Sequence, residues 1–271
     1  MSKRILIASI SLALMATNLF AGGHCAADKT LTEGKFTIAT GNPAYFPWVL
    51  DDAPESGKGF EAAVAYAVAK EMGFAEQDVV WVRSSFDEAI QPGVKNFDIN
   101  MQQYSITAER DQVVDFSVPY YTAPMAVLVG AGAADTKPTI AALKGLKWGA
   151  VGSTTAVQKI ANVVQPTADP LLYGDNADVN AAITANQIDG AMFDLPTALF
   201  LSAVMIEGSK VIGQFPPETS DNADQFGMLM EEGNPLKACV DAALTAMTEN
   251  GTLASIEAQW LQDTTGVPLI K

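Results

Sequence analysis

The sequence predicts an α/β protein in which two successive units each build a mostly parallel sheet flanked by helices. Strand-like and helix-like patterns alternate from Lys35 onward, and a second series of the same kind begins after Tyr121. Hydrophobic residues make up 49% of the chain. The 244 residues that follow residue 27 are enough for one large domain or for two lobes, each with its own core.

The N-terminus has the pattern of a secretory signal. Lys3 and Arg4 precede an apolar run over 5–16, which is too short for a permanent membrane span, and a small-residue stretch ends at Ala27. We expect cleavage after Ala27, with cleavage after Gly23 as the alternative. Lipid attachment at Cys25 is a further alternative, but no aliphatic residue precedes it as a lipobox requires. An exported protein without a lipid anchor is therefore expected.

Loss of residues 1–27 would remove His24, the only histidine, and one of the two cysteines. Cys239 would remain alone, so this cleavage predicts that no disulfide forms within the chain and that Cys239 is a small core residue. A Ser-His-Asp triad, a Cys-His pair and a histidine-ligated metal are excluded on the same basis. We expect no metal or cofactor.

The charge of the chain limits its partners. From residue 28 onward there are 14 basic and 31 acidic residues, a net charge of −17. Such an acidic protein is a poor partner for nucleic acid or for an anionic membrane. The charge does not exclude a small ligand held in a cleft.

The first unit alternates regularly between strands and helices. Its expected elements are a strand at 36–40, a helix at 60–72 ended by Gly73, a strand at 79–82, a poor helix at 86–94 interrupted by Pro92, and a strand from Asp98. In parallel sheets, ligands bind at the carboxyl ends of the strands. The loops after these strands are therefore the places to look for a site.

The stretch DINMQQYSITAERDQVVDFSVPYY, residues 98–121, carries the strongest site signal. Ser105 and Thr107 end a strand, and a helix over 108–114 capped by Thr107 would place Arg110 in its first turn. A guanidinium beside hydroxyls and free helix N–H groups suits a small carboxylate.

A surface position for Arg110, paired with Asp111 or Asp115, is the alternative to ligand contact.

The loop after the first strand, residues 41–52, adds three aromatic residues, Tyr45, Phe46 and Trp48, in a stretch that also contains two prolines. These are more than an ordinary solvated loop carries, although core packing remains an equal explanation for each.

The second unit begins after Tyr121. Its expected elements are strands at 125–129, 147–151 and 190–194, and helices at 140–144, from 155 to 164, and from 176 to 186 with Asp175 as cap. The turn GSTT, residues 152–155, presents N–H groups and hydroxyls that suit an anion, or merely caps its helix. Asp194 ends a strand before Leu195 and Pro196 start a helix, so it too has a simple reading as an N-cap.

The last third of the chain returns to the first unit. A segment rich in Pro, Asp and Ser, 214–225, crosses back, a strand follows at 226–230, and two helices fill 234–261. Three motifs, SIT to PYY, GSTT and this ending, resemble those of the periplasmic amino-acid-binding proteins of ABC importers, family 3 of the solute-binding proteins. Gly59, Phe60 and Glu61 match the family's signature helix in part.

The resemblance implies a two-lobed periplasmic-binding-protein fold of type II, with a ligand cleft between the lobes. Lobe 1 would comprise 28–121 and 223–271, and lobe 2 would comprise 122–222. The protein would be a periplasmic monomer that traps a free amino acid or a similar zwitterion and presents it to the membrane permease subunits of an importer, with no nucleic acid partner.

The resemblance also assigns roles to residues. Arg110, Ser105 and Thr107 would hold the ligand carboxylate from lobe 1, with Thr155, Thr154 and Ser153 from lobe 2. Asp194 would accept hydrogen bonds from the α-ammonium, and the rings of Tyr45 and Phe86 would cover the ligand. Asn42, Gln102 and Gln103 stand where they could reach the ligand side chain, and these neutral groups favour a neutral polar amino acid.

Two other classes of function are kept as alternatives. Periplasmic dehydratases of the cyclohexadienyl dehydratase type resemble these binding proteins and need a carboxylic acid in the cleft. A sensor or scaffold lobe is the other alternative, although no attached domain supports it. Turnover of prephenate or arogenate would distinguish the dehydratase from the binding protein.

Overall fold

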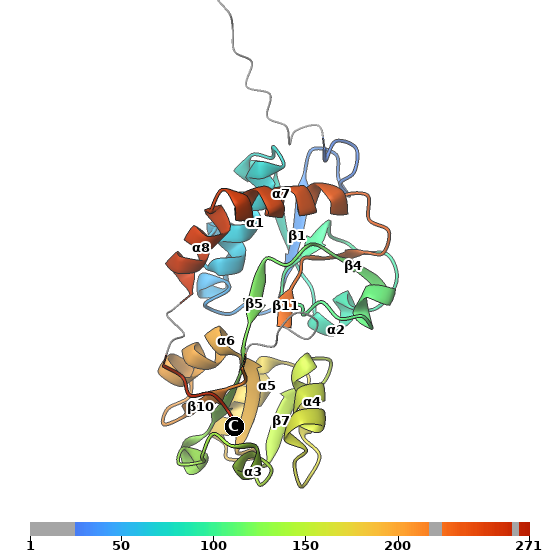
Figure 1. Ribbon diagram of the computed structural model, residues 1–271. Helices are drawn as coiled ribbons and strands as arrows, with labels where there is room; N and C mark the ends of the chain where they lie inside the picture. The colour runs from blue at the N-terminus through green and yellow to red at the C-terminus, as the bar shows by residue number, and fades with distance from the viewer. Residues whose placement is uncertain (1–24, 217–223, 262–265) are drawn as a thin grey trace, which may run out of the picture.

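The computed structural model describes residues 25–216, 224–261 and 266–271. Figure 1 shows them as two lobes joined by a narrow waist. Lobe 1 contains the described residues of 25–121 and 224–261, and lobe 2 contains 122–216 and 266–271. No helix within the described ranges is both long and apolar enough to cross a membrane.

Lobe 1 is built on a five-stranded sheet in the order β2-β1-β3-β12-β4. Its elements are β1 (Phe36–Thr40), η1 (Leu50–Asp52), η2 (Pro54–Ser56), α1 (Phe60–Glu71), η3 (Glu76–Asp78), β2 (Val79–Arg83), α2 (Phe86–Ala89), β3 (Ile99–Asn100), η4 (Arg110–Gln112), β4 (Val114–Phe116), β12 (Leu229–Glu231), α7 (Lys237–Glu249) and α8 (Thr252–Trp260).

The core of lobe 1 lies between this sheet and helices α1, α7 and α8, which pack on one another (Figure 1). All five residues of β1 are buried, and α1 buries the apolar stripe that contains Phe60, Val64 and Val68. Gly59 starts α1 with φ +104, and a Cβ there would lie 2.4 Å from the Trp48 carbonyl oxygen. Only glycine fits this approach, which fixes the aromatic loop against the helix.

Lobe 2 is built on a second five-stranded sheet in the order β10-β6-β9-β7-β8. Helices α3 and α4 cover one of its faces, and α5 and α6 cover the other. Its elements are β6 (Met125–Val129), η5 (Ala131–Ala133), α3 (Ile140–Leu143), β7 (Trp148–Val151), α4 (Thr155–Lys159), the π-helix η6 (Ile160–Val164), β8 (Leu171–Tyr173), α5 (Asn176–Thr184), β9 (Gly190–Asp194), α6 (Leu195–Phe200), the π-helix η7 (Leu201–Met205) and β10 (Lys210–Gln214).

The predicted α/β class is confirmed, but each sheet is mixed where a mostly parallel one was expected. In lobe 1, β1 pairs in parallel with β2 and β3, whereas β12 runs antiparallel to β3 and β4. In lobe 2, β7 pairs in parallel with β8 and β9, whereas β6 runs antiparallel to β9 and β10. The antiparallel pairs involve β4, β6, β10 and β12, which come directly before or after β5 and β11 in the chain.

The waist is a two-stranded antiparallel ribbon of β5 (Tyr121–Ala123) and β11 (Asp224–Phe226), visible at the centre of Figure 1. The expected crossing at 121/122 falls at this ribbon, and we propose a lobe boundary there. The expected crossing at 222/223 lies outside the described residues. Residues 217–223 of the expected return segment lie outside the described residues. The expected strand at 226–230 is in fact two short strands, β11 and β12, interrupted at Gly227 and Met228.

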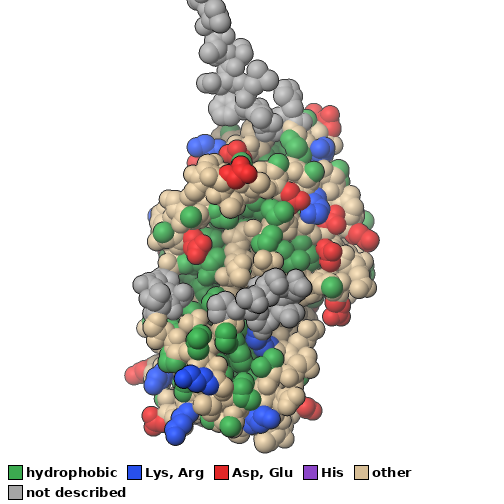
Figure 2. Space-filling model, in the orientation of Figure 1, with side chains coloured by type: hydrophobic (Ala, Val, Ile, Leu, Met, Phe, Trp, Pro, Cys, Tyr) green, Lys and Arg blue, Asp and Glu red, His purple; other side chains and the backbone are tan. Residues whose placement is uncertain are grey.

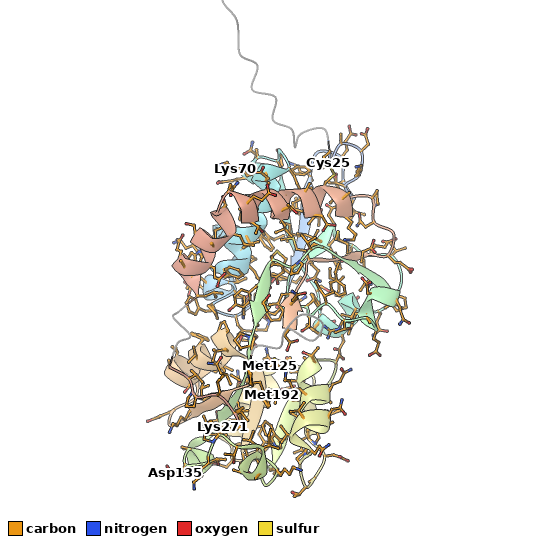
Figure 3. The ribbon with its side chains drawn as sticks, viewed as in Figure 1. Cys25, Lys70, Met125, Asp135, Met192 and Lys271 are labelled. Atoms are coloured by element: carbon orange, nitrogen blue, oxygen red, sulfur yellow. A yellow bond between two sulfur atoms is a disulfide. The ribbon has the colours of Figure 1, made fainter. Side chains whose placement is uncertain are left out.

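The end of the chain departs from the expected division. Residues 266–271 pack on lobe 2, not on lobe 1: Leu269 pairs with Gln214 of β10, and Ile270 is buried in the lobe 2 core. The Ile140 N–H donates to the Lys271 carbonyl oxygen at 2.9 Å. Figure 3 shows Lys271 in the lower lobe, although the preceding helices lie in the upper one. Assigning 223–271 to lobe 1 is therefore wrong for its last six residues.

The helix expected at 108–114 is also wrong. Only a single turn forms, η4, and Val114 already belongs to β4. The segment VDF alternates buried and half-buried side chains and pairs with β12, so strand pairing prevails over helix formation in β-branched sequence. The expected strand from Asp98 is likewise shortened to two residues, because Gln103 takes a left-handed φ of +53 and turns the chain.

Cys25 forms a disulfide with Cys239 of α7, with their Cα atoms 5.7 Å apart. Cys25 lies at the top of lobe 1 in Figure 3. The expectation that no disulfide forms rested on cleavage after Ala27, which would discard Cys25. This bridge is compatible with cleavage after Gly23, and it corrects the description of Cys239 as an unpaired core residue, although Cys239 is indeed buried.

Candidate binding cleft

A cavity of about 260 Å³ lies between the two lobes. Pockets for small molecules usually measure roughly 300–1,000 Å³, so this one suits a ligand at the small end of that range. Its lobe 1 wall is formed by the chain that follows β1, β2 and β3, and its lobe 2 wall by the turns that follow β7, β8 and β9. The cavity thus lies at the carboxyl ends of all six strands, where α/β sheets bind ligands.

Ten of the twelve expected site residues line this cavity. They are Asn42, Tyr45, Phe86, Gln102, Gln103, Ser105, Arg110, Thr154, Thr155 and Asp194. The two that do not are Thr107 and Ser153, and each instead supports Arg110. The Thr107 hydroxyl accepts from the Arg110 backbone N–H at 3.2 Å, and the Ser153 carbonyl oxygen accepts from the Arg110 guanidinium at 2.7 Å.

Arg110 is buried, with only 8% of its surface exposed. One guanidinium nitrogen donates to the Ser105 carbonyl oxygen at 2.8 Å, and the other donates to Ser153 of lobe 2. The guanidinium also lies over the Phe86 ring, 5.3 Å from its centroid. Its side-chain partners do not include Asp111 or Asp115, so the surface ion pair does not form. Burial lowers the pKa of Arg110, although Tyr104, Asp224 and Glu109 counteract it.

A guanidinium carries five N–H donors, and two of them are used by these carbonyl oxygens. The remaining donors are available to an acceptor in the cavity. A buried cation whose protein partners are neutral carbonyl oxygens lacks a directly bonded anion. The arrangement therefore suits a ligand that brings a carboxylate.

Direct contacts hold the lobes closed over the cavity. The hydroxyls of Ser105 and Thr155 lie 3.3 Å apart, and Thr155 also donates to Asp224 of the waist at 3.2 Å. The Trp48 indole N–H donates to the Thr197 hydroxyl at 2.8 Å. These contacts, together with that between Arg110 and Ser153, join the two walls.

Of the three aromatic residues in the loop after β1, Trp48 lies in the lobe 1 core at 2% exposure while also reaching the cavity wall. Phe46 contacts Phe200 of lobe 2, with ring centroids 5.1 Å apart. Tyr45 lines the cavity, and its hydroxyl is buried without a hydrogen-bond partner. The loop thus divides its aromatic residues among core, lobe contact and cavity.

Asp194 caps α6 by accepting from the Thr197 N–H at 2.8 Å. The capping interpretation is therefore correct, and Asp194 also lines the cavity. Burial raises the pKa of Asp194 to about 6, while the hydrogen bonds from Thr197 act in the opposite direction and Asp224 adds to the rise. An ammonium group in the cavity would favour the ionised form.

Glu61 is a cavity residue that sequence reasoning did not select. It is 1% exposed, and it accepts from the Gln103 backbone N–H at 2.9 Å, from the Gln103 amide and from the Tyr120 hydroxyl. Burial raises the pKa of Glu61 to about 7, against these three hydrogen bonds and with a further rise from Asp194. The signal was present in the partial match of Gly59, Phe60 and Glu61 to a signature helix.

The two glutamines are mostly engaged within the protein. The Gln102 amide donates to the Ser84 carbonyl oxygen, to Asn100 and to the Tyr104 hydroxyl. The Gln103 amide donates to Glu61. The Gln102 N–H groups are therefore turned toward the protein, and its carbonyl oxygen remains for a ligand, whereas Gln103 keeps its carbonyl oxygen and one amide N–H. Asn42, by contrast, is exposed at the cavity edge.

Phe86 stacks on Tyr104, with ring centroids 4.4 Å apart and an interplanar angle of 24°. Asp175 was expected only as a helix cap, which it is, but it also lines the cavity. From lobe 2, Met125 and Met192 complete the apolar floor, and Figure 3 shows them in adjacent strands. Among the described residues, no group of three or more His, Cys, Asp or Glu side chains could hold a metal ion.

Fold and cavity together define a two-lobed α/β protein of the periplasmic-binding-protein class, with a cavity between the lobes. Residues 37–263 match the model of the bacterial extracellular solute-binding proteins, family 3, and the chain belongs to this family. The resemblance seen in the sequence is thereby confirmed.

Similar proteins agree with the family assignment. The L-arginine-binding protein of Pseudomonas aeruginosa is 25% identical over 265 residues, covering 96% of each chain. The structure of an ancestral arginine-binding protein bound to glutamine aligns with a TM-score of 0.70 at 26% identity, over 84% of this chain and 98% of that one. The ancestral amino acid-binding protein AncCDT-1, a precursor of cyclohexadienyl dehydratase, aligns at 0.68 and 27% identity, over 84% and 96%.

Proposed function

We propose that this protein captures a free amino acid by its carboxylate and ammonium groups and delivers it to the permease subunits of an ABC importer. The observation that carries the proposal is the placement of Arg110 and Asp194 in opposite walls of one cavity. Arg110 is the single basic residue among the described residues that line it. A zwitterion offers a carboxylate to one wall and an ammonium to the other.

In this proposal, Arg110 binds the ligand carboxylate through its remaining N–H groups. The backbone N–H groups at the start of α4, which follows Thr154, add donors from lobe 2. The hydroxyls of Ser105 and Thr155 lie 3.3 Å apart across the cleft, and they exchange their present partners to donate to the carboxylate. Asp194 accepts from the ammonium. Each charge-assisted hydrogen bond contributes about 1.5–3 kcal/mol, so several together give micromolar or tighter binding.

For the ligand side chain, the proposal keeps the preference for a neutral polar group. Asn42 at the cavity edge, and the carbonyl oxygens of Gln102 and Gln103, are neutral hydrogen-bonding groups. The export signal and the strongly acidic composition support a periplasmic protein that acts as a monomer and does not bind nucleic acid.

A thermal unfolding screen tests the proposal. The ligand-stripped, refolded protein is heated with each amino acid at 1 mM. A ligand bound with micromolar affinity adds about 4 kcal/mol to the free energy of unfolding, which raises Tm by roughly 10 °C for a chain of this size. The absence of a shift with every amino acid would contradict the proposal.

Two variants then test the assigned residues. Arg110→Ala and Asp194→Ala should each abolish the ligand-induced shift while the protein remains folded, because each removes the partner of one ligand charge. Tyr66→Phe, on lobe 1 outside the cavity, is the matched control and should bind as the wild type does. Normal binding by both alanine variants would show that the ligand sits elsewhere.

A dehydratase remains the second candidate, because the cleft contains two carboxyl groups, Glu61 and Asp194, whose pKa values are raised toward neutrality. Such groups are typical of acid–base catalysis as well as of buried binding sites. Incubation with prephenate or arogenate separates the two functions. Turnover by the wild type that is lost in Glu61→Gln would favour the enzyme, and unchanged substrate would favour binding alone.

A further inference from the structure

One polar group in the cavity has no partner and no role in holding an α-carboxylate or α-ammonium. The Tyr45 hydroxyl is buried and makes no hydrogen bond. Most buried polar side-chain atoms in native proteins have at least one partner, so an exception in a cavity wall points to a ligand. Tyr45 lies in the loop after β1, which forms one wall of the cavity.

Three aspartates influence this hydroxyl electrostatically. Burial is the main cause that raises the pKa of Tyr45, and Asp175, Asp52 and Asp178 follow in that order. Asp52 is already paired with Arg83, at 2.6 Å. Asp175 lines the cavity from lobe 2, and one of its oxygens accepts from the Asp178 N–H at 2.9 Å. Its other oxygen makes no hydrogen bond or ion pair within the described chain.

Several other polar groups of the cavity wall are engaged within the protein. The Gln102 and Gln103 amides donate to protein acceptors. The Ser85 hydroxyl caps α2 by accepting from the Glu88 N–H, and the Ser84 hydroxyl donates to the Ser85 carbonyl oxygen. The Tyr45 hydroxyl and the second Asp175 oxygen, one from each lobe, have no partner within the described chain, and the phenol oxygen and the carboxylate oxygen can both accept a hydrogen bond from a ligand.

We propose that Tyr45 and Asp175 form a side-chain subsite that binds a ligand end group carrying N–H donors. This inference rests on the proposed function and specifies which amino acids the cleft prefers. The tyrosine oxygen accepts from one N–H and the aspartate from another, across the closed cleft. A terminal amide and a guanidinium both present such a pair of donors, and they differ in charge.

An apolar ligand side chain would leave the Tyr45 hydroxyl buried and unpartnered in the complex as well. That unpaired group lowers affinity for a ligand of similar size without donors. The comparison of glutamine with methionine isolates this effect, because the two side chains have similar length and differ in the donor. The comparison of arginine with citrulline isolates charge, since the shapes are alike and only arginine is cationic.

The experiment is calorimetric titration of the full-length exported protein, freed of ligand, with these four amino acids. The wild type should bind glutamine at least about tenfold more tightly than methionine. Tyr45→Phe should reduce that ratio about three- to tenfold by weakening glutamine and leaving methionine unchanged, because only the oxygen is removed. Tyr66→Phe, a tyrosine outside the cavity, is the matched control and should keep the wild-type ratio.

The arginine and citrulline arms identify the charge of the end group. If arginine binds more tightly than citrulline and Asp175→Asn removes the difference, the subsite accepts a cation. If citrulline and glutamine bind as well as arginine, and Asp175→Asn weakens all three alike, the subsite accepts a neutral donor. Both results support the subsite, and they show whether the end group that it binds is cationic or neutral.

Other results overturn it. If Tyr45→Phe changes glutamine and methionine affinities equally, or changes neither, the hydroxyl has no selective role. If the wild type binds methionine as tightly as glutamine, the subsite is wrong while amino-acid capture stands. If the wild type binds no amino acid, the proposed function fails first. Tyr45→Phe should keep the wild-type Tm without ligand, since the lost oxygen has no protein partner.

Discussion

The two lobes build their walls of the cleft in different ways. Lobe 1 contributes loops that follow β1, β2 and β3, and their long side chains, Arg110, Tyr45 and Phe86, reach into the cavity. Lobe 2 contributes tight strand-to-helix turns, in which Thr154, Asp175 and Asp194 start α4, α5 and α6. One wall thus offers projecting side chains, and the other offers helix starts with short polar groups.

The lobes differ in charge as well. The described residues of lobe 1 include 8 basic and 21 acidic residues, whereas those of lobe 2 include 6 and 7, so the net charges are −13 and −1. Figure 2 shows the contrast on one face, with lysines prominent on the lower lobe. The acidity of the whole chain, which argued against nucleic acid, is therefore mostly a property of lobe 1.

The lobes also differ in what holds them together. A disulfide ties the N-terminal end of lobe 1 to α7. Lobe 2 has no disulfide among its described residues, and the last residues of the chain instead pack beside β10, where Leu269 forms a single bridge with Gln214. Lobe 1 is therefore cross-linked covalently, whereas lobe 2 depends on non-covalent packing of the chain end.

The largest expected effect tests the covalent link of lobe 1. The bridge between Cys25 and Cys239 closes a loop of sequence separation 214, and the chain-entropy model assigns such a loop roughly 5 kcal/mol. Reduction should lower the free energy of unfolding by about that amount in urea titrations. The double variant Cys25→Ser, Cys239→Ser should start at the lower value and not respond to reductant. Equal free energies of unfolding for the oxidised and reduced wild type would show that the disulfide does not stabilise lobe 1.

A smaller effect tests the packing of the chain end on lobe 2. Ile270 is 6% exposed in the lobe 2 core, so Ile270→Ala should cost about 2–4 kcal/mol. Hydrogen exchange should locate the loss in β6 and β10 and leave lobe 1 protected. The neighbouring Leu269 is 48% exposed, and Leu269→Ala should change stability by less than about 0.5 kcal/mol. Equal deprotection of both lobes would mean that the tail does not belong to lobe 2 alone.

The smallest effect concerns the carboxylate that lobe 2 offers the ligand. The pKa of Asp194 is raised from 3.8 to about 6 in the empty cleft, so at pH 5 the group is mostly protonated and cannot accept from an ammonium. Amino-acid affinity should therefore be about tenfold weaker at pH 5 than at pH 8. Asp194→Asn should bind weakly at both pH values, and an N-acetylated amino acid, which lacks the ammonium, should show no such profile.

The raised pKa of Asp194 has the opposite effect on the stability of the ligand-free protein as pH rises. A carboxyl group that holds its proton more tightly when folded stabilises the folded state at low pH, and that contribution is lost as pH rises from 3.8 through about 6. Glu61, with a pKa raised to about 7, acts in the same direction. Rising pH should thus weaken the free protein and strengthen the complex. A parallel trend in both would contradict the assignment of these two groups.

Much of the fold could be predicted, because segments with a clear apolar periodicity form the strands and helices that this periodicity indicates. β1, β6 and β9 appear at their expected residues, and α1 within one residue of its expected end. The polar residues placed at strand ends gather in one cavity for the same reason, since the carboxyl ends of parallel strands meet. Arg110 reached its position even though its expected helix is a single turn.

What the sequence did not predict depends on contacts between distant residues. Glu61 lies in α1, and the apolar stripe of that helix is sufficient to explain the helix as part of the core. The contact between Glu61 and Gln103 forms because the chain turns at Gln103 after β3. The disulfide was missed because cleavage after Ala27 was assumed to remove Cys25. The last six residues pack beside β10 because β10 is an edge strand of its sheet, and the local sequence of these residues does not predict that contact.

The position of these last residues sets a limit on movement. Leu261 packs on the core of lobe 1, and Val267 packs on lobe 2. Five residues lie between them, so six Cα-to-Cα steps can span at most about 20 Å. The ribbon of β5 and β11 joins the lobes at the waist (Figure 1), and the chain between Leu261 and Val267 links them again. A separation of Leu261 from Val267 beyond this span would require residues 266–271 to leave β10.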